Sequence, residues 1–263
     1  MENAKIQQLL TESYDFKFGD YISEGFEILK KNIGGFVIFA IVFLAVSMIS
    51  GLIPFIGSLA NSLILTPCLM AGLYLVANQV QKNQQTEFGD FFKGFQYVSQ
   101  LALVTLLAGI IVILSLLPFI VANAGLGSWL MEFMMEADTF EENPELIFEN
   151  LPPFSSWTLI LLLPAIYLGT AYSWAPLFVV FHKLGFWEAL EASRIMITKK
   201  WFIYFFFTIV VGIIAIIGML GFCIGFLFTF PAAYCMIYAA FADVTKLNEI
   251  NEDDVDLMDH LVE

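Results

Sequence analysis

Few residues in this chain have the type and spacing that catalytic or metal chemistry requires. The only histidines, His182 and His260, stand far apart in the sequence. Neither has a second ligand at the spacing of a zinc site, and the chain contains no nucleophile elbow, phosphate loop or paired acids. We therefore predict no catalytic residue, no bound cofactor and no metal, and we do not expect the protein to be an enzyme.

In each of three apolar runs, a proline is followed several residues later by a tyrosine. The residues are Pro67 and Tyr74, Pro164 and Tyr172, and Pro231 and Tyr238. Because proline frees backbone carbonyls and tyrosine offers a hydroxyl, these residues could line a polar cavity between membrane helices. The alternative is hydrogen bonding between helices. No ionisable residue lies in the middle of these runs, which disfavours a proton- or ion-coupled pump.

Acidic residues gather in two segments. Residues 123–153 contain seven acids and no Lys or Arg, and residues 246–263 contain another seven acids. The first segment lacks the alternating acids and the glycine of a calcium loop, so we interpret it as a solvated surface rather than a cation site. The second is an acidic tail that includes Val255, Leu257 and Leu261. It either binds a protein partner as a short helix or stays unstructured.

The composition indicates an integral membrane protein. Of the 263 residues, 59% are hydrophobic and 14% are charged, whereas soluble domains contain about 45–50% apolar and about 25% charged residues. The formal net charge of -14 offers nucleic acid no attraction, so we expect no such partner. The fold class that follows is an all-α membrane protein surrounded by a lipid bilayer.

Apolar runs long enough to cross the bilayer occur six times. Residues 33–77 carry no charge, and as a helix they would reach about twice across a hydrocarbon core of roughly 30 Å, so they must fold back. Gly51 and Pro54 mark that turn. The predicted spans are residues 33–52, 55–79, 97–122, 156–181, 200–217 and a last one that ends near residue 242.

Positive charge predicts the orientation of these spans. In a six-span chain all 11 Lys and Arg residues lie on the side of the two termini, and that side is cytoplasmic in membrane proteins. We therefore expect a multi-pass protein of the bacterial inner (cell) membrane, with cytoplasmic N- and C-termini and residues 123–153 as an external loop. Two lysine pairs, Lys30 with Lys31 and Lys199 with Lys200, are predicted to contact lipid head groups, including those of anionic lipids.

Three short segments repeat along the chain, and each begins with phenylalanine. They cover residues 18–25, 88–95 and 186–193, and they carry Asp20, Asp90 and Glu188 two residues after the phenylalanine. An acid at that place caps the start of a helix. We therefore predict three hairpins of spans, each preceded by an amphipathic helix at the cytoplasmic interface. The modules are residues 18–80, 81–183 and 184–245, between a polar segment (1–17) and the acidic tail (246–263).

One stretch resembles known sequences. Residues 185–205 carry Glu188-Ala189-Leu190, Ser193 and Lys199-Lys200 ahead of an aromatic span, and Pro231 to Tyr234 follow further on. This pattern is similar to uncharacterised bacterial membrane proteins with about six spans. They include domain-of-unknown-function families and the membrane domain that is fused to some glycerophosphodiester phosphodiesterases. The resemblance implies a six-span fold and no defined activity, catalytic residue or cofactor.

The sequence leaves three hypotheses for function. The first is a non-enzymatic membrane component that organises lipid or binds a partner protein, because the chain has three interfacial helices and two exposed termini. The alternative is a transporter or export accessory for a small or lipidic molecule, which the parallel repeats and the proline-broken helices favour. An enzyme acting on lipid would need a polar cluster that the spacing does not show.

Overall fold

The computed structural model describes residues 9–135, 156–220 and 224–248, and every regular element in these ranges is a helix. Six helical segments within them are long and apolar enough to cross a membrane, which confirms the predicted number of spans. In order, the spans are Ile33–Gly51, Ile56–Gln81, Phe88–Ala122, Ser156–His182, Trp201–Met219 and Phe226–Val244. These lengths and compositions are those of a multi-pass membrane protein.

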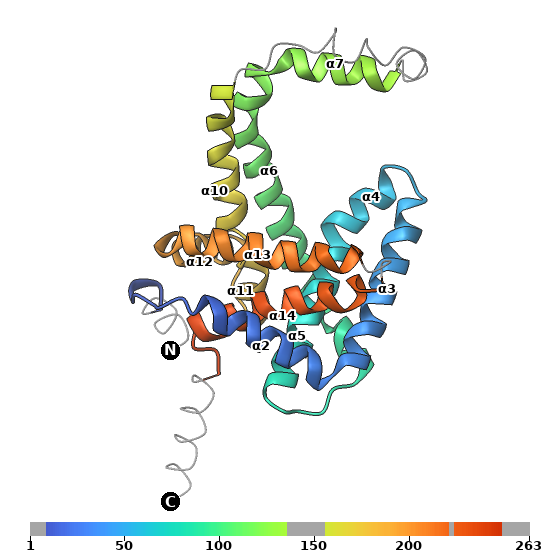
Figure 1. The fold of residues 1–263 in the computed structure, drawn as a ribbon, viewed down its shortest axis with the longest axis vertical. Coiled ribbons are helices and arrows are strands. Elements are labelled where there is room, and N and C mark those ends of the chain that lie inside the picture. The colour runs from blue at the N-terminus through green and yellow to red at the C-terminus, as the bar shows by residue number, and fades with distance from the viewer. Residues whose placement is uncertain (1–8, 136–155, 221–223, 249–263) are drawn as a thin grey trace, which may run out of the picture. The chain divides into compact units, whose positions relative to one another are not determined.

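The chain forms two compact units, residues 1–106 with 170–263, and residues 107–169. Figure 1 shows the elements in chain order. They are α2 (Phe18–Lys31), α3 (Ile33–Gly51), α4 (Ile56–Ala60), the π-helix η1 (Asn61–Leu65), α5 (Thr66–Gln81), the 3-10 helix η2 (Phe88–Tyr97), α6 (Val98–Ala122), α7 (Ala124–Met135), the 3-10 helix η3 (Ser156–Leu162), α10 (Leu163–Ala171), α11 (Ala175–His182), α12 (Phe186–Lys199), α13 (Trp201–Leu220) and α14 (Phe226–Val244).

The core of the first unit is made by the helices that end the even spans, α5, α11 and α14. Each contacts the other two, and the rings of Tyr74 and Tyr234 join α5 to α14 at 5.7 Å. In the most apolar stretch of α14, 67% of residues are buried, against 22% in α3 and in α13. Small residues such as Ala71 and Ala239, both buried, allow this close packing.

The odd spans α3 and α13 expose apolar side chains. Ile38 and Ile41 on α3 and Phe202 and Phe206 on α13 are about half exposed or more, with fractions of 52%, 49%, 72% and 59%. In water such a surface would be unfavourable, because exposed apolar area costs about 25 cal/mol per Å². Lipid chains solvate it instead, which agrees with the membrane class that the composition predicts.

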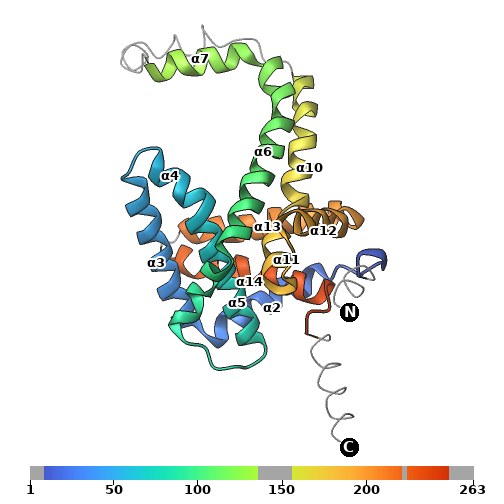
Figure 2. The ribbon, with the colours of Figure 1, turned by 180° about the vertical axis from the view of Figure 1, so that it is seen from behind.

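Each of the three repeated segments packs on an even span. In both views α2 lies alongside α14 (Figure 1 and Figure 2), where a Cβ on Gly25 would lie 2.4 Å from Cγ of Met236. The segment η2 packs on α5, where a Cβ on Gly72 would lie 1.7 Å from the carbonyl oxygen of Phe91. The third segment, α12, packs on α11. Glycine permits the first two contacts because it has no side chain.

The acids of the repeat have the predicted local role in two of the three segments. The carboxylates of Asp90 and Glu188 accept hydrogen bonds from the backbone N–H groups of Glu87 (3.0 Å) and Gly185 (3.4 Å). Both therefore cap the start of their helix. Asp20 lies in the first turn of α2 but makes no such bond within the described residues.

The fourth predicted span, residues 156–181, is broken rather than one regular helix. In the first unit α10 ends at Ala171 and α11 begins at Ala175. The buried hydroxyl of Ser193 accepts from the backbone N–H of Trp174 (3.1 Å) and donates to the carbonyl oxygen of Ala171 (2.6 Å). A side chain of α12 thus satisfies the backbone groups that the break leaves free, as membrane-embedded backbone requires.

The second unit contains the C-terminal part of α6, α7, η3 and the first part of α10. The hydroxyl of Thr158 donates to Oδ1 of Asn123 at 3.3 Å, which joins the end of α6 to η3. The predicted external loop of residues 123–153 begins with the helix α7, which the acidic composition had not indicated. Residues 136–155 lie outside the described residues, and so does most of the acidic tail.

Candidate functional site: the polar ends of the spans

The three even spans end in the same unusual backbone conformation. Asn83, Lys183 and Lys246 follow the second, fourth and sixth spans, and each has a positive φ, of 54°, 50° and 50°. After α5, the N–H of Asn83 bonds to the carbonyl of Val80 and the N–H of Gln84 to that of Gln79. This pattern is a Schellman motif with asparagine in place of the usual glycine.

A chain of polar groups joins α2, α5 and α14 at this end. The amide of Asn78 donates to the hydroxyl of Tyr238 at 2.6 Å, and that hydroxyl donates to Oε1 of Gln81 at 2.7 Å. The same Oε1 accepts from Asn248 at 2.8 Å, and the Gln81 amide donates to the carboxylate of Glu24. Each of these bonds joins residues more than 50 positions apart, so the chain fixes the three helices to one another.

Burial and neighbouring charge shift the acid–base properties of α2. The pKa of Glu24 is raised, chiefly by burial and further by the charges of Asp243 and Glu27. The hydroxyl of Tyr21 donates to Asp243 at 2.6 Å, and burial raises the pKa of this tyrosine. Lys17 also bonds to Asp243, at 3.1 Å. Because both groups of that ion pair are well exposed, it contributes little to stability.

The polar segment before α2 also lies at this end of the first unit. The hydroxyl of Tyr14 donates to the carbonyl oxygen of Met196 at 2.9 Å, and Lys199 donates to the carbonyl oxygen of Glu12. The carboxylate of Glu12 in turn pairs with Lys246 at 3.3 Å. Burial lowers the pKa of Lys199. Lys199 was predicted to contact lipid, and at least one of its three ammonium protons is donated to the protein itself.

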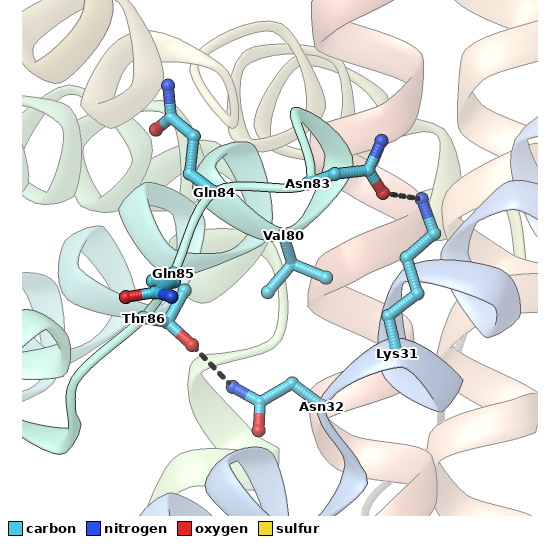
Figure 3. Close-up of a pocket in the computed structure, with 7 residues that line it drawn as sticks. All are labelled: Lys31, Asn32, Val80, Asn83, Gln84, Gln85 and Thr86. Carbon is cyan, nitrogen blue, oxygen red and sulfur yellow. Dashed lines mark hydrogen bonds between the residues drawn. The ribbon is translucent and has the colours of Figure 1, made fainter.

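Two polar hollows flank the loop between the first two modules. The first, of about 460 Å³, contains Lys31, Asn32, Asn83 and Thr86 in its lining (Figure 3). The second, of about 570 Å³, is lined by Gln79, Gln85, Thr86, Glu87, Asp90 and Lys93. In it Lys93 pairs with Asp90 at 2.7 Å. The first hollow is lined by a cation without a carboxylate, and the second by two carboxylates and one cation.

The six predicted cavity-lining residues are packed differently. Pro67, Tyr74, Pro231 and Tyr238 are buried within the first unit, Tyr172 is partly exposed there, and Pro164, in the second unit, is exposed. None of them lines the two hollows above or the smaller one of about 130 Å³ beside Glu24. Tyr74 contacts Tyr234 and Tyr238 bonds to Asn78, which is the interhelical role that we gave as the alternative. The cavity itself stays a prediction.

The lysines predicted to contact lipid differ in their surroundings. Lys30 and Lys31 are exposed on the last turn of α2, and Lys31 donates to Oδ1 of Asn83 at 3.0 Å. Lys199 and Lys200 are partly buried at the start of α13. Of the two histidines, His182 packs 5.9 Å from the ring of Phe241. The other, His260, lies outside the described residues.

Sequence reasoning missed the polar chain, although all its residues are ordinary in type. Asn78 and Gln81 lie three residues apart at the end of an apolar run, on one face of a helix, and Glu24 lies within α2, ahead of the first span. That spacing signals a polar face, but not its partner. Tyr238 had been singled out for a cavity, and its partner Asn78 lies 160 residues away.

Comparison with family models, with curated proteins and with solved structures gave no match.

Proposed function

We propose that the six spans form three hairpins whose inner ends share the cytoplasmic side of the membrane. Contacts within the first unit support this arrangement. Each of them joins the end of one span, or the segment next to it, to the end of a different span or to the segment next to that one. The pairs are Asn32 with Thr86, Gln81 with Asn248, Gln100 with Phe186, His182 with Phe241, and Glu12 with both Lys199 and Lys246. These pairs include lysines, which in membrane proteins favour the cytoplasmic side.

The same unit supports the proposal of three parallel modules. The segments η2 and α12 each pack on the even span that precedes them, and α2 packs on the last even span, α14. The three contacts therefore follow one cyclic rule, as copies around an axis along the membrane normal would. The left-handed residues Asn83, Lys183 and Lys246 recur at equivalent places.

For the activity, we propose a non-enzymatic membrane component that organises lipid or binds a partner at its cytoplasmic face. The observation that carries this proposal is the polar face itself, where the lead-in segment, three modules and the start of the acidic tail meet in hydrogen bonds. The described residues contain no group of three or more His, Cys, Asp or Glu placed to hold a metal ion. We propose this face as the place where a partner protein or lipid head groups dock.

The experiment that tests orientation labels single cysteines in intact cells and in inverted vesicles. We replace Cys223 with serine, keep the buried Cys68 and Cys235, and place a cysteine at position 140 or at Lys183. Position 140 should react with an impermeant reagent from outside, and position 183 only from the cytoplasmic side. Reaction at position 140 from the cytoplasm alone would overturn the orientation. A partner that co-purifies with the full chain, and is lost when residues 249–263 are removed, supports the docking role.

A transporter is the second candidate, and two irregularities favour it. The second span contains the π-helix η1 at Asn61–Leu65, and the fourth is broken after Ala171. Interrupted spans are common where transporters bind their substrates. Flux measured in liposomes separates the candidates, because the docking role predicts no release of entrapped solutes above that of empty liposomes. Release that is saturable would favour the transporter.

A further inference from the structure

The first hollow in Figure 3 has the chemistry of an anion site. Of its seven lining residues only Val80 is apolar, and the only charged one is Lys31. The lining therefore presents one cation and no carboxylate. The neighbouring hollow differs in charge, because the carboxylates of Glu87 and Asp90 line it.

Internal hydrogen bonds occupy the side-chain oxygens of Asn32, Asn83 and Thr86 and leave donors of these residues and of Lys31 available. Asn83 Oδ1 accepts from Lys31 (3.0 Å), and Thr86 Oγ1 accepts from the amide of Asn32 (3.0 Å). The other polar end of Asn32, Oδ1, accepts from the N–H of Gly35 (3.2 Å). What remains is the Asn83 amide, the Thr86 hydroxyl proton and two of the three Lys31 ammonium protons. An oxyanion with several acceptor atoms complements such a set.

Local backbone structure positions these donors. Asn83 occupies the left-handed position of the Schellman motif that ends α5, so its side chain leaves the helix toward Lys31 (Figure 3). Asn32 lines the hollow and is also the N-cap residue of α3. The positive end of the α3 dipole therefore lies beside the hollow, but so do the negative ends of α2 and α5, so the preference for an anion rests on Lys31 and the free donors and not on the helix dipoles.

The hollow also lies where a lipid head group would lie. It sits at the start of the first span and the end of the second, so the proposed topology puts it at the level of the head groups. Along α3, which begins next to the hollow at Ile33, the side chains of Ile33, Ile38 and Ile41 are exposed, with fractions of 42%, 52% and 49%. Acyl chains can cover that apolar surface while the head group occupies the hollow, which a small soluble ligand could not do.

We infer that this hollow binds a phosphate-ester anion, carried by an anionic phospholipid of the inner leaflet. Lys31 supplies the charge, while Asn83 and Thr86 supply hydrogen bonds to the phosphate oxygens. The inference rests on the proposed function and sharpens it, because it names the lipid chemistry and the place of contact. It also separates Lys31 from its neighbour Lys30, which is exposed on the same helix and does not line the hollow.

Native mass spectrometry of the full chain in detergent micelles tests the inference, with phosphatidylglycerol as the probe. The variant Lys31→Gln should retain about fivefold less lipid, the factor that one lysine near a phosphate contributes, and Lys30→Gln should change retention less than about twofold. The variant Asn83→Gly keeps the left-handed backbone, removes the amide and should also lower retention. Unchanged thermal unfolding of each variant shows that the fold is intact.

A second arm adds glycerol phosphate to distinguish the two sources of the phosphate. Lipid that stays bound to the wild-type chain in its presence supports the lipid as the occupant. Displacement of the lipid that depends on Lys31 supports the same site with a soluble ester. Equal loss in Lys30→Gln and Lys31→Gln, or no loss in Lys31→Gln, would overturn the inference. Because micelles have no sides, this result does not depend on the labelling of position 140, so the two proposals can fail separately.

Discussion

Replacing Gly25 with alanine should weaken the contact between α2 and α14. The new Cβ would lie 2.7 Å from the backbone nitrogen and 2.8 Å from the Cα of Met236, besides 2.4 Å from its Cγ. The side chain of Met236 can rotate away, but its backbone cannot. Since carbon atoms in contact lie about 3.5 Å apart, the helices must separate by about 0.7 Å at this point.

The expected cost follows from that separation. Overpacking a well-packed contact costs about 1–3 kcal/mol, whereas exchange of glycine for alanine within a helix contributes about 0.5–1 kcal/mol of stability. Gly19 is the matched control, because it lies in the same helix and a Cβ there meets nothing within 4 Å. Because both variants gain this propensity contribution, it cancels, and they should differ by roughly 1–3 kcal/mol in free energy of unfolding, with Gly19→Ala the more stable.

The assay is reversible unfolding of the purified chain in detergent, followed by circular dichroism. A crosslink measurement complements it, because loss of the α2–α14 contact should leave the six spans in place and lower crosslinking between α2 and α14. The reasoning would be refuted if Gly25→Ala proved as stable as Gly19→Ala. In that case α2 would not dock on α14, and the cyclic rule of the three modules would lose one of its contacts.

Three further variants test the remaining contacts, each by unfolding in detergent. Gly72→Ala should destabilise by about 1–3 kcal/mol or more, since its Cβ would meet a backbone oxygen, whereas Gly89→Ala, with nothing within 4 Å, should not. Ser193→Ala should cost about 1–3 kcal/mol, because it leaves two buried backbone groups at the break of the fourth span without a side-chain partner. Glu24→Gln should remove a pH dependence: the folded chain raises the pKa of Glu24, so it holds the proton more tightly than the unfolded chain, and stability falls as pH rises from the ordinary glutamate pKa through the raised one.

Each of these expectations has a contrary result. Equal stability of the Gly72 and Gly89 variants would mean that η2 does not pack on α5. An unaffected Ser193→Ala protein would mean that water or another group satisfies the break. A Glu24→Gln protein whose stability still falls over the same pH range as the wild type would show that another acid causes the effect. Below the unfolded pKa of Glu24 the two proteins should be equally stable.

The sequence was sufficient for the features that depend on local composition. Each span is recognisable because a run of apolar residues must leave water wherever its neighbours are, so six spans follow from the sequence alone. Helix caps are equally local, since Asp90 and Glu188 bond to backbone groups three residues away. The repeat of phenylalanine and acid was visible in the sequence for the same reason.

The tertiary structure alone decided which helix each segment contacts. Tyr238 bonds to Asn78, which is the interhelical role named as the alternative to lining a cavity, and Ser193 satisfies a break in another span. Nothing in the local sequence specifies such partners, because one hydroxyl or amide can pair with many groups of equal chemistry. The choice depends on distances between segments 19 to 160 residues apart, and only the packing of the whole chain sets those distances. The hollow beside Lys31 arises in the same way, from a helix end and a loop 52 residues away.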